Sequence, residues 1–460
     1  MDEPRPKTQK ELAFAPLTTG EARPDKAEGT EPSAAKDDTE SPANRALLME
    51  EVCKRENLRE ALHRVRSNKG SPGVDGMTVD ALAEHLKSHW PILRTQLLEG
   101  TYQPKSVKRV EIPKPDGGTR KLGVPTVQDR FVQQALMQVL QKRWDQTFSE
   151  HSYGFRPNRS AHQAVARAQQ YIAEGCEWVV DLDLEKFFDR VNHDILMGRV
   201  AKRISDKRML KLIRAFLNAG VMDNGLESPT EEGTPQGGPL SPLLSNLLLD
   251  ELDRELENRG LRFVRYADDC NIYVRSERAG QRVMESVTRF ITRRLKLKVN
   301  QSKSAVAQPG TRKFLGFSFT SGREPKRRIA PKALDRLKDR IREMTRRNRG
   351  ISLEEMVEDL SRYLRGWKAY FGYCQTPSVL GHLDEWIRRR LRMVIWKQWK
   401  RGTTRYRELR KRGVPELCAG VTAGACHGPW RIAGSPAMAQ AYRNTAFTLL
   451  GLPSLRGTTA

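Results

Sequence analysis

The sequence contains few cysteines and lacks any long apolar segment. Its 460 residues include 6 cysteines, none of them in a Cys-x-x-Cys pair. A disulfide scaffold and a zinc ribbon are therefore disfavoured, and reduced thiols in a cytoplasmic protein are expected. Cys418, Cys426 and His427 lie close together but offer too few ligands for zinc. No apolar run reaches about 18 residues, so no transmembrane helix is expected, and the N-terminus lacks the apolar core of a signal peptide.

Acidic residues are also fewer than basic ones. Lys and Arg number 81 against 56 Asp and Glu, which gives a net charge of +25 and a pI near 10. This excess favours a polyanionic partner, with nucleic acid ahead of an acidic membrane. The net charge is −4 over residues 1–40, +11 over 41–320 and +18 over 321–460, so the basic excess per residue is greatest at the C-terminal end.

The composition divides the chain into four segments. Residues 1–42 are rich in Pro, Thr, Ala and charged residues and predict a disordered acidic tail. Residues 43–320 mix helical periodicity with short strands and hairpins. Residues 328–402 contain three basic helices with short breaks, which is typical of a small helical domain. Residues 403–460 are Gly-rich, basic and weakly periodic.

Several elements within 43–320 follow from periodicity and turn residues. Helices are expected at 43–63 and at 79–100, and the second ends at Gly100. Strands at 106–112 and 121–124 flank a Lys-Pro-Asp-Gly-Gly turn and predict a hairpin. The remaining expected elements are a helix at 127–148, a strand at 177–182 that runs into a helix, helices at 240–258 and 281–297, and a strand at 312–321.

The segment 261–276, LRFVRYADDCNIYVRS, predicts a second hairpin with Asp268 and Asp269 at its tip. Adjacent carboxylates repel each other unless a cation is near. An exposed polar turn is one interpretation of this pair, since Asp is a common turn residue. Half of a metal site is the other.

A second acidic pair lies in the segment WVVDLDLEKFF. Asp181 and Asp183 are two residues apart on an apolar strand, so their side chains share one face. Either of them could cap the helix that follows. If this strand pairs with the hairpin, however, three carboxylates from two strands could bind two Mg²⁺ ions through oxygen ligands.

Two further segments have phosphate-binding chemistry. Lys114 and Arg120 stand on opposite arms of the first hairpin, where an anion such as a triphosphate would relieve their repulsion. A Pro-Gln-Gly-Gly-Pro loop precedes the helix start Ser241–Pro242, and its glycines allow a ligand to approach the backbone closely. A solvated hairpin and an ordinary loop are the alternatives.

These segments, in this order, resemble the reverse transcriptase domain, and most closely the reverse transcriptases encoded by bacterial group II introns. The resemblance covers about residues 44–455. It rests on GSPGVDGMT, IPKPDGGTRKLGVPTVQDR, YGFRPNRSAHQAV, VVDLDLEKFFDRVNH, GTPQGGPLSPLLSNLLLDELD, RYADD, LKVNQSKS, FLGF, YLRGWKAYFGYC and PWRIAGSPAMAQAY. It implies an α+β fold: a right-hand polymerase of fingers and palm, with an antiparallel palm sheet and an α-helical thumb.

The resemblance also implies roles for single residues. Asp183, rather than Asp181, matches the first catalytic aspartate, and Asp268 and Asp269 match the other two. Leu184 would offer its backbone carbonyl to a metal ion, and Phe188 matches the aromatic gate that excludes a ribose 2′-OH. The remaining matches are Lys114, Arg120 and Gln236 around the incoming dNTP, Tyr266, Lys303 and Gly316 near the primer end, and Arg156, which either contacts the template or stabilises the fingers.

The expected activity is RNA-directed DNA synthesis with two Mg²⁺ ions, for which Mn²⁺ could substitute. The primer 3′-OH attacks the α-phosphate of a dNTP, and catalysis is mostly positioning and charge neutralisation. The expected partners are the intron RNA, an RNA template–DNA primer duplex, dNTPs and target DNA, and residues 328–402 and 403–460 would be the maturase thumb and a DNA-binding segment. The oligomeric state stays open.

Three alternatives remain at this point. The chain could be an RNA-binding splicing factor that no longer polymerises, although the complete set of catalytic residues argues against this. It could be a domesticated reverse transcriptase of phage defence or a CRISPR locus. An RNA-dependent RNA polymerase is disfavoured because those usually carry Gly-Asp-Asp at the hairpin. The absence of Cys-x-x-Cys leads us to expect no HNH endonuclease, as in group IIC-like lineages.

Overall fold

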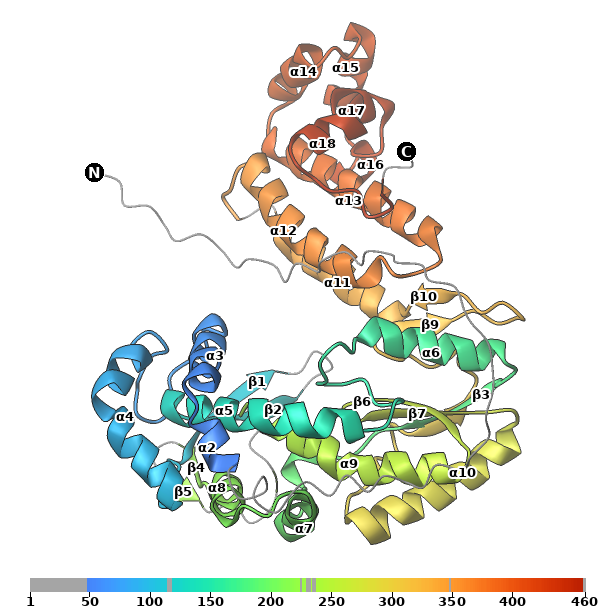
Figure 1. Cartoon of the computed structure of the whole chain (residues 1–460). Helices are drawn as coiled ribbons and strands as arrows, with labels where there is room; N and C mark the ends of the chain where they lie inside the picture. Colours follow the sequence, from blue (N-terminus) through green and yellow to red (C-terminus); the bar gives the residue numbers. More distant parts are fainter. Residues whose placement is uncertain are drawn as a thin grey trace, which may run out of the picture. The chain divides into compact units, whose positions relative to one another are not determined.

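The computed structural model describes residues 48–113, 118–223, 226–228, 233, 237–346 and 349–457. The disordered tail predicted for residues 1–42 lies outside these residues. The described chain is α+β, as expected, and Figure 1 shows its elements in chain order. No helix in the described part is both long enough and apolar enough to span a bilayer.

The first part of the chain combines helices with the expected hairpin. The helix predicted at 43–63 begins outside the described residues, and its described part, from residue 48, is two helices, α2 (Leu48–Val52) and α3 (Arg55–Ser67). The next helix, α4 (Leu82–Glu99), ends at a left-handed C-cap, Gly100, as its sequence predicts. Strands β1 (Val107–Pro113) and β2 (Thr119–Val124) pair antiparallel. Short strands β4 (Val221–Asp223) and β5 (Leu226–Ser228) extend this sheet in the order β2-β1-β4-β5.

A second sheet of four antiparallel strands forms the palm, in the order β6-β7-β3-β8. Its strands are β6 (Arg262–Tyr266), β7 (Asp269–Val274), β3 (Trp178–Leu182) and β8 (Ala305–Ala307). The surrounding helices are α5 (Val127–Trp144), η1 (Asp145–Thr147), α6 (Ala161–Ala173), η2 (Phe187–Asp189), α7 (His193–Arg203), α8 (Lys207–Asn218), α9 (Ser241–Asn258), α10 (Glu277–Phe290) and the π-turn η3 (Ile291–Leu295).

The two faces of the palm sheet are packed against different helices. Val180 and Leu182 of β3 belong to the core formed with α9 and α10, whereas Val179 packs with residues of α6. Figure 1 shows α6 and the pair α9 and α10 on opposite sides of β6 and β7. Since side chains alternate along a strand, Asp181 and Asp183 project to the same side as Val179.

The C-terminal part is helical throughout. The three expected thumb helices are α11 (Pro331–Met344), α12 (Leu353–Phe371) and α13 (Pro377–Gln398), which follow the hairpin of β9 (Phe317–Phe319) and β10 (Arg327–Ile329). Further short helices are α14 (Gly402–Lys411), α15 (Glu416–Gly424), α16 (Pro429–Ile432), α17 (Pro436–Ala441) and α18 (Asn444–Leu449). One hydrophobic core joins thumb and C-terminal helices, from Ile329 to Leu455, so no separate core begins at residue 403.

Candidate active site

The Asp268–Asp269 pair occupies the tip of the β6–β7 hairpin. Tyr266 pairs with Asp269, which leaves Ala267 and Asp268 as the two turn residues. Ala267 has a φ of 57°, a left-handed conformation that costs a non-glycine residue about 1–2 kcal/mol. A Cβ atom on Gly154 would lie only 2.3 Å from the Ala267 nitrogen, so this glycine is needed for the close approach. The tip is therefore a strained turn that neighbouring segments hold in place.

A buried arginine supports this turn. The side chain of Arg265 is 1% exposed and pairs with that of Asp253, which is 0% exposed, at 2.5 and 2.7 Å. Its Nη1 donates to the Ala267 carbonyl at 2.9 Å and to Asn246 Oδ1 at 3.0 Å. Asn246 in turn donates to the Gly154 carbonyl at 2.8 Å. One connected network thus fixes the residue that immediately precedes the acidic pair.

Asp183 lies opposite the tip. Strand β3 pairs antiparallel with β7 up to Leu182 and Cys270, so Asp183 and Asp269 are the next opposed positions. The charge of Asp183 acts on both Asp268 and Asp269, which places the three carboxylates close together. The two elements do pair in one sheet, which is the condition that the sequence set for a shared site.

Burial raises the pKa of both aspartates at the tip, and neighbouring carboxylates add to the rise. Desolvation and the charge of Asp183 raise the pKa of Asp268, whereas Arg120 and Arg265 oppose the rise. Desolvation and the charges of Asp268, Asp181 and Asp183 raise the pKa of Asp269 to about 6, although its side chain is solvent-accessible. An added cation would relieve this repulsion.

The donor set at the tip fits a hard divalent cation. Asp183, Asp268 and Asp269 offer carboxylate oxygens, the ligands that Mg²⁺ and Mn²⁺ prefer. Among the residues that the structure describes, no three His, Cys, Asp or Glu side chains are grouped so as to hold a metal ion by themselves. Mg²⁺ commonly completes its shell with waters and substrate phosphates, so these open carboxylates are compatible with it.

Asp181 has a different partner from its neighbour on the strand. Arg312 donates to Asp181 Oδ2 through Nε at 2.8 Å and through Nη2 at 2.6 Å. The same Nη2 donates to the Lys303 carbonyl at 2.5 Å. Lys303 Nζ lies 3.7 Å from Asp183 Oδ2. Asp181 is thus paired with an arginine, whereas the cation that the described part of the chain places nearest to Asp183 is an exposed lysine, which agrees with the choice of Asp183 as the catalytic residue.

A cavity of about 510 Å³ is lined by two of the four residues predicted to bind the nucleotide, Arg120 and Phe188. Arg120 from β2, Phe188 from η2 and the loop glycines Gly237 and Gly238 all line it. Gly237 has a φ of 138°. A Cβ atom on Gly237 would meet the Gly123 carbonyl at 2.7 Å, so the loop depends on glycine here. The remaining lining residues are Val65, Asn68, Gly70, Leu122, Arg130, Gln134, Phe155, Pro239, Ser241 and Pro242.

Arg130 is a cavity residue that the sequence analysis missed. Its Nη2 donates to the Ser71 carbonyl at 2.6 Å, while its Nε is buried and has no hydrogen-bond partner in the described part of the chain. Burial lowers the pKa of Arg130, but a guanidinium stays charged at neutral pH. The only signal in the sequence was its position one turn into the helix after the first hairpin.

The other predicted residues have mixed outcomes. Lys114 and Gln236 lie outside the described residues. The Leu184 side chain is buried in the core, and its backbone forms a bridge with Val299. Tyr266 is half-buried beside the tip, as its position in the motif predicts.

The structure corrects the predicted position of Gly316 and favours one of the two roles considered for Arg156. Gly316 is not in a strand: it lies in the turn before β9 with a φ of 82°, where a Cβ would come within 3.0 Å of the Phe371 ring. The Arg156 side chain is 5% exposed and bonds Asp145 at 2.8 Å and the Ser152 carbonyl at 3.0 Å. Of the two roles considered for Arg156, this geometry favours stabilisation of the fold over template contact.

Comparisons with known proteins agree with this geometry. A family model described as reverse transcriptase (RNA-dependent DNA polymerase) matches residues 112–319, and one described as the group II intron maturase-specific domain matches residues 334–413. The chain is 34% identical to protein YkfC of Escherichia coli (strain K12), over 56% of this chain and 78% of YkfC. It is 29% identical to the group II intron-encoded protein LtrA of Lactococcus lactis subsp. cremoris, over 56% of this chain and 54% of LtrA, so it spans about half of that relative.

Proposed function

Because this chain belongs to the family of group II intron reverse transcriptases and maturases, we propose that it is an active RNA-directed DNA polymerase. It extends a primer 3′-OH with dNTPs on an RNA template, and it binds intron RNA through its maturase domain to assist splicing and mobility. The observation that carries the proposal is the position of Asp183, which directly follows the last β3–β7 pair, Leu182 and Cys270, and whose charge acts on Asp268 and Asp269 at a tip fixed by buried Arg265.

The protein groups have separate tasks in this reaction. Arg120, which lines the cavity, binds the triphosphate, and the Phe188 ring packs against the sugar and excludes a 2′-OH. Asp183, Asp268 and Asp269 would hold Mg²⁺, which when bound supplies charge neutralisation for phosphoryl transfer. The strained tip keeps the carboxylates in place before substrate arrives, so little reorganisation is required during the reaction.

The partners and the compartment are proposed on the same basis. The net charge of +25 suits an RNA–DNA duplex and intron RNA, and binding should weaken steeply with salt. We also propose that the protein works in the cytoplasm. All six cysteines are free thiols, which suits a reducing compartment.

The test is an Asp268→Ala variant assayed for primer extension on an RNA template. We expect extension to be lost while RNA binding and thermal stability are retained, because the tip is fixed by Arg265 and not by Asp268. Asp80→Ala removes an exposed carboxylate from a turn and serves as the matched control, with activity expected to equal that of wild type. Substantial extension by Asp268→Ala would disprove the assignment of the site, whereas inactive wild-type protein that still binds intron RNA would favour a splicing factor that no longer polymerises.

A further inference from the structure

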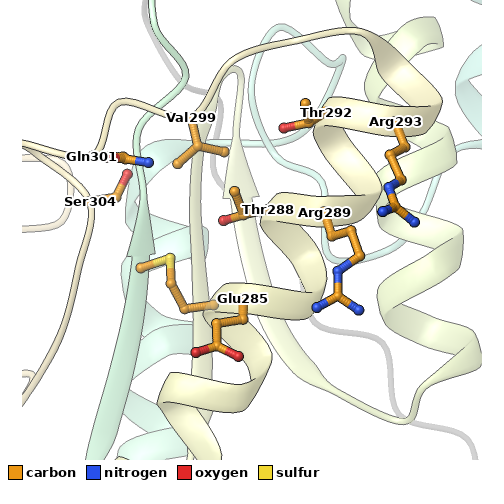
Figure 2. Close-up of a pocket in the computed structure, with 9 residues that line it drawn as sticks. Glu285, Thr288, Arg289, Thr292, Arg293, Val299, Gln301 and Ser304 are labelled. Carbon is orange, nitrogen blue, oxygen red and sulfur yellow. The ribbon is translucent and has the colours of Figure 1, made fainter.

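A second cavity, of about 550 Å³, lies on the α10 side of the palm sheet. One wall is the end of α10 with the π-turn η3, and the other is the chain segment that precedes β8. Figure 2 shows Thr288 and Thr292 on the side of the helix that faces Val299, Gln301 and Ser304. The remaining lining residues are Met284, Glu285, Arg289 and Arg293. This is a different space from the cavity that holds Arg120 and Phe188.

Two arginines on the helical wall have no partner in the described part of the chain. Arg289 and Arg293 are exposed, and the structure gives neither side chain a hydrogen bond or an ion pair to a described residue. The neighbouring Arg294, by contrast, pairs with Glu251 at 3.2 Å. Glu285 is the only acidic side chain among the described residues that line the cavity, so this lining carries a net positive charge.

The rest of the lining has the chemistry of a nucleotide site. Thr288, Thr292 and Ser304 provide hydroxyl groups, and Gln301 provides an amide. Met284 and Val299 add apolar surface of the kind on which a sugar or base packs. The volume falls within the range of about 300–1,000 Å³ that is usual for small-ligand sites. Guanidinium groups prefer phosphate oxygens, to which they donate in pairs.

The local backbone brings the two walls together. α10 widens into the π-turn η3 at Ile291–Leu295, and Lys296 then takes a left-handed φ of 56°. This reversal sends the chain back along the helix, so that Val299 and Ser304 face it across the cavity. π-turns within helices are rare and often occur at functional positions.

The second wall also contacts the catalytic aspartate. The Asn300 N–H donates to the Asp183 carbonyl at 2.8 Å, and the Asp183 N–H donates to Ser304 Oγ at 3.0 Å. Val299 forms a bridge with Leu184. A ligand that presses on this wall therefore acts on the backbone of Asp183 from the face of the sheet opposite the carboxylates.

We propose that this cavity binds one nucleotide of an RNA strand, with a backbone phosphate on Arg289 and Arg293 and the sugar or base against Met284 and Val299. The bound strand then stabilises the segment that holds the Asp183 backbone. The choice of RNA rests on the proposed function, but the binding itself requires no polymerase activity.

The test is photocrosslinking of a hexauridylate that carries 5-iodouridine to the full-length protein, with an RNA–DNA template-primer filling the catalytic cleft. Mass spectrometry then measures the crosslinks in peptides spanning residues 284–304. We expect R289A/R293A to lower this yield about tenfold, since two charged contacts are lost. R278A/R282A removes the same charge from exposed positions of α10 outside the cavity and should change the yield less than about twofold.

Further variants and readouts decide the remaining outcomes. R289K/R293K keeps both charges and should retain at least half of the wild-type yield, which separates loss of charge from damage to the helix. Hexauridylate should also slow amide exchange in peptides containing Asn300 in wild type but not in R289A/R293A.

Equal losses of crosslink yield in R289A/R293A and R278A/R282A, or no crosslink within residues 284–304, would overturn the proposal. Displacement of hexauridylate by UMP at equal nucleotide concentration would overturn the assignment to an RNA strand in favour of a free nucleotide. An inactive polymerase with an intact crosslink would refute only the proposed function.

Discussion

The β6–β7 tip and the β1–β2 hairpin both carry groups of the proposed active site, but they are held in opposite ways. Behind the tip is Arg265, whose side chain is 1% exposed and bonded to Asp253 and to the Ala267 carbonyl. On the hairpin, Arg120 and its neighbour Lys121 are exposed, and the structure gives Arg120 no ion pair with a described residue. The carboxylates are thus fixed before substrate arrives, whereas the Arg120 side chain is ordered only when it binds the triphosphate. Substitutions in the buried network behind the tip should lower stability and turnover together, whereas substitutions of exposed residues on the hairpin should affect nucleotide affinity alone.

The largest expected effect is that of Arg265→Met. It leaves the Asp253 carboxylate buried without a partner and should lower the free energy of unfolding by about 3–5 kcal/mol. Chemical denaturation measures this loss, and single-turnover primer extension measures the accompanying loss of activity.

The double variant Arg265→Met/Asp253→Leu separates stability from positioning. It removes the unpaired charge and should recover most of the stability, because buried ion pairs can be replaced by apolar residues of similar volume. Extension should remain low, since the Ala267 carbonyl still lacks its donor at 2.9 Å. Full recovery of both stability and extension would show that Arg265 has no positioning role.

On the hairpin, Arg120→Ala should raise the KM for dNTPs by about 10–100-fold, the cost of one or two charge-assisted hydrogen bonds. The free energy of unfolding should stay within about 0.5 kcal/mol of wild type because the side chain is exposed. Steady-state kinetics on an RNA template provides the measurement. Lys121→Ala, the next residue on β2, is the matched control, and an equal rise in its KM would reduce the effect of Arg120 to general electrostatics.

Several elements of the fold and of the candidate site could be predicted from local patterns in the sequence. Alternation along WVVDLDL places Asp181 and Asp183 on one face, and the Tyr-Ala-Asp-Asp turn predicts the hairpin tip. The helices that carry clear caps or periodicity, such as the one ending at Gly100, are also predicted correctly.

The sequence does not reveal contacts between residues that are far apart in the chain. It also does not reveal helices whose periodicity is weak. Arg265 looks like an ordinary exposed strand residue, and only the fold buries it against Asp253. Arg312 is 131 residues from Asp181, so no spacing rule connects them. The segment after residue 402 is Gly-rich, and its short helices α14 to α18 form because they pack on the thumb core, which local propensity does not show.

Phe188 lies between the two regions, on η2 after β3 and in the cavity with Arg120. Phe188→Ala should increase incorporation of ribonucleotides relative to dNTPs by roughly tenfold, equivalent to about 1.4 kcal/mol of discrimination. Competition between the two triphosphates on one template gives the ratio. Phe155→Ala removes an aromatic ring that is 49% exposed in the same cavity and should leave the ratio unchanged. An unchanged ratio in Phe188→Ala would exclude its role as the gate.

The smallest effect tests the charge at the tip itself. Desolvation and the charges of Asp268, Asp181 and Asp183 raise the pKa of Asp269 to about 6 from an ordinary value of 3.8. The folded protein therefore binds this proton more tightly than the unfolded chain does. The resulting penalty is absent below about pH 3.8, grows as the pH rises to 6 and is complete above it.

Asp269→Asn should therefore stabilise the metal-free protein at pH 7.5 by about 1 kcal/mol, a value reduced for solvent screening of an accessible group, and should change its stability little near pH 4. Denaturation in EDTA at the two pH values measures the difference, and Asp80→Asn in an exposed turn is the control. Added Mg²⁺ should reverse the order at pH 7.5, since only the wild type keeps all three carboxylates to bind it. If Asp269→Asn is no more stable at pH 7.5 than wild type in EDTA, the tip is not electrostatically strained. Fixation by Arg265 alone would then distinguish it from the β1–β2 hairpin.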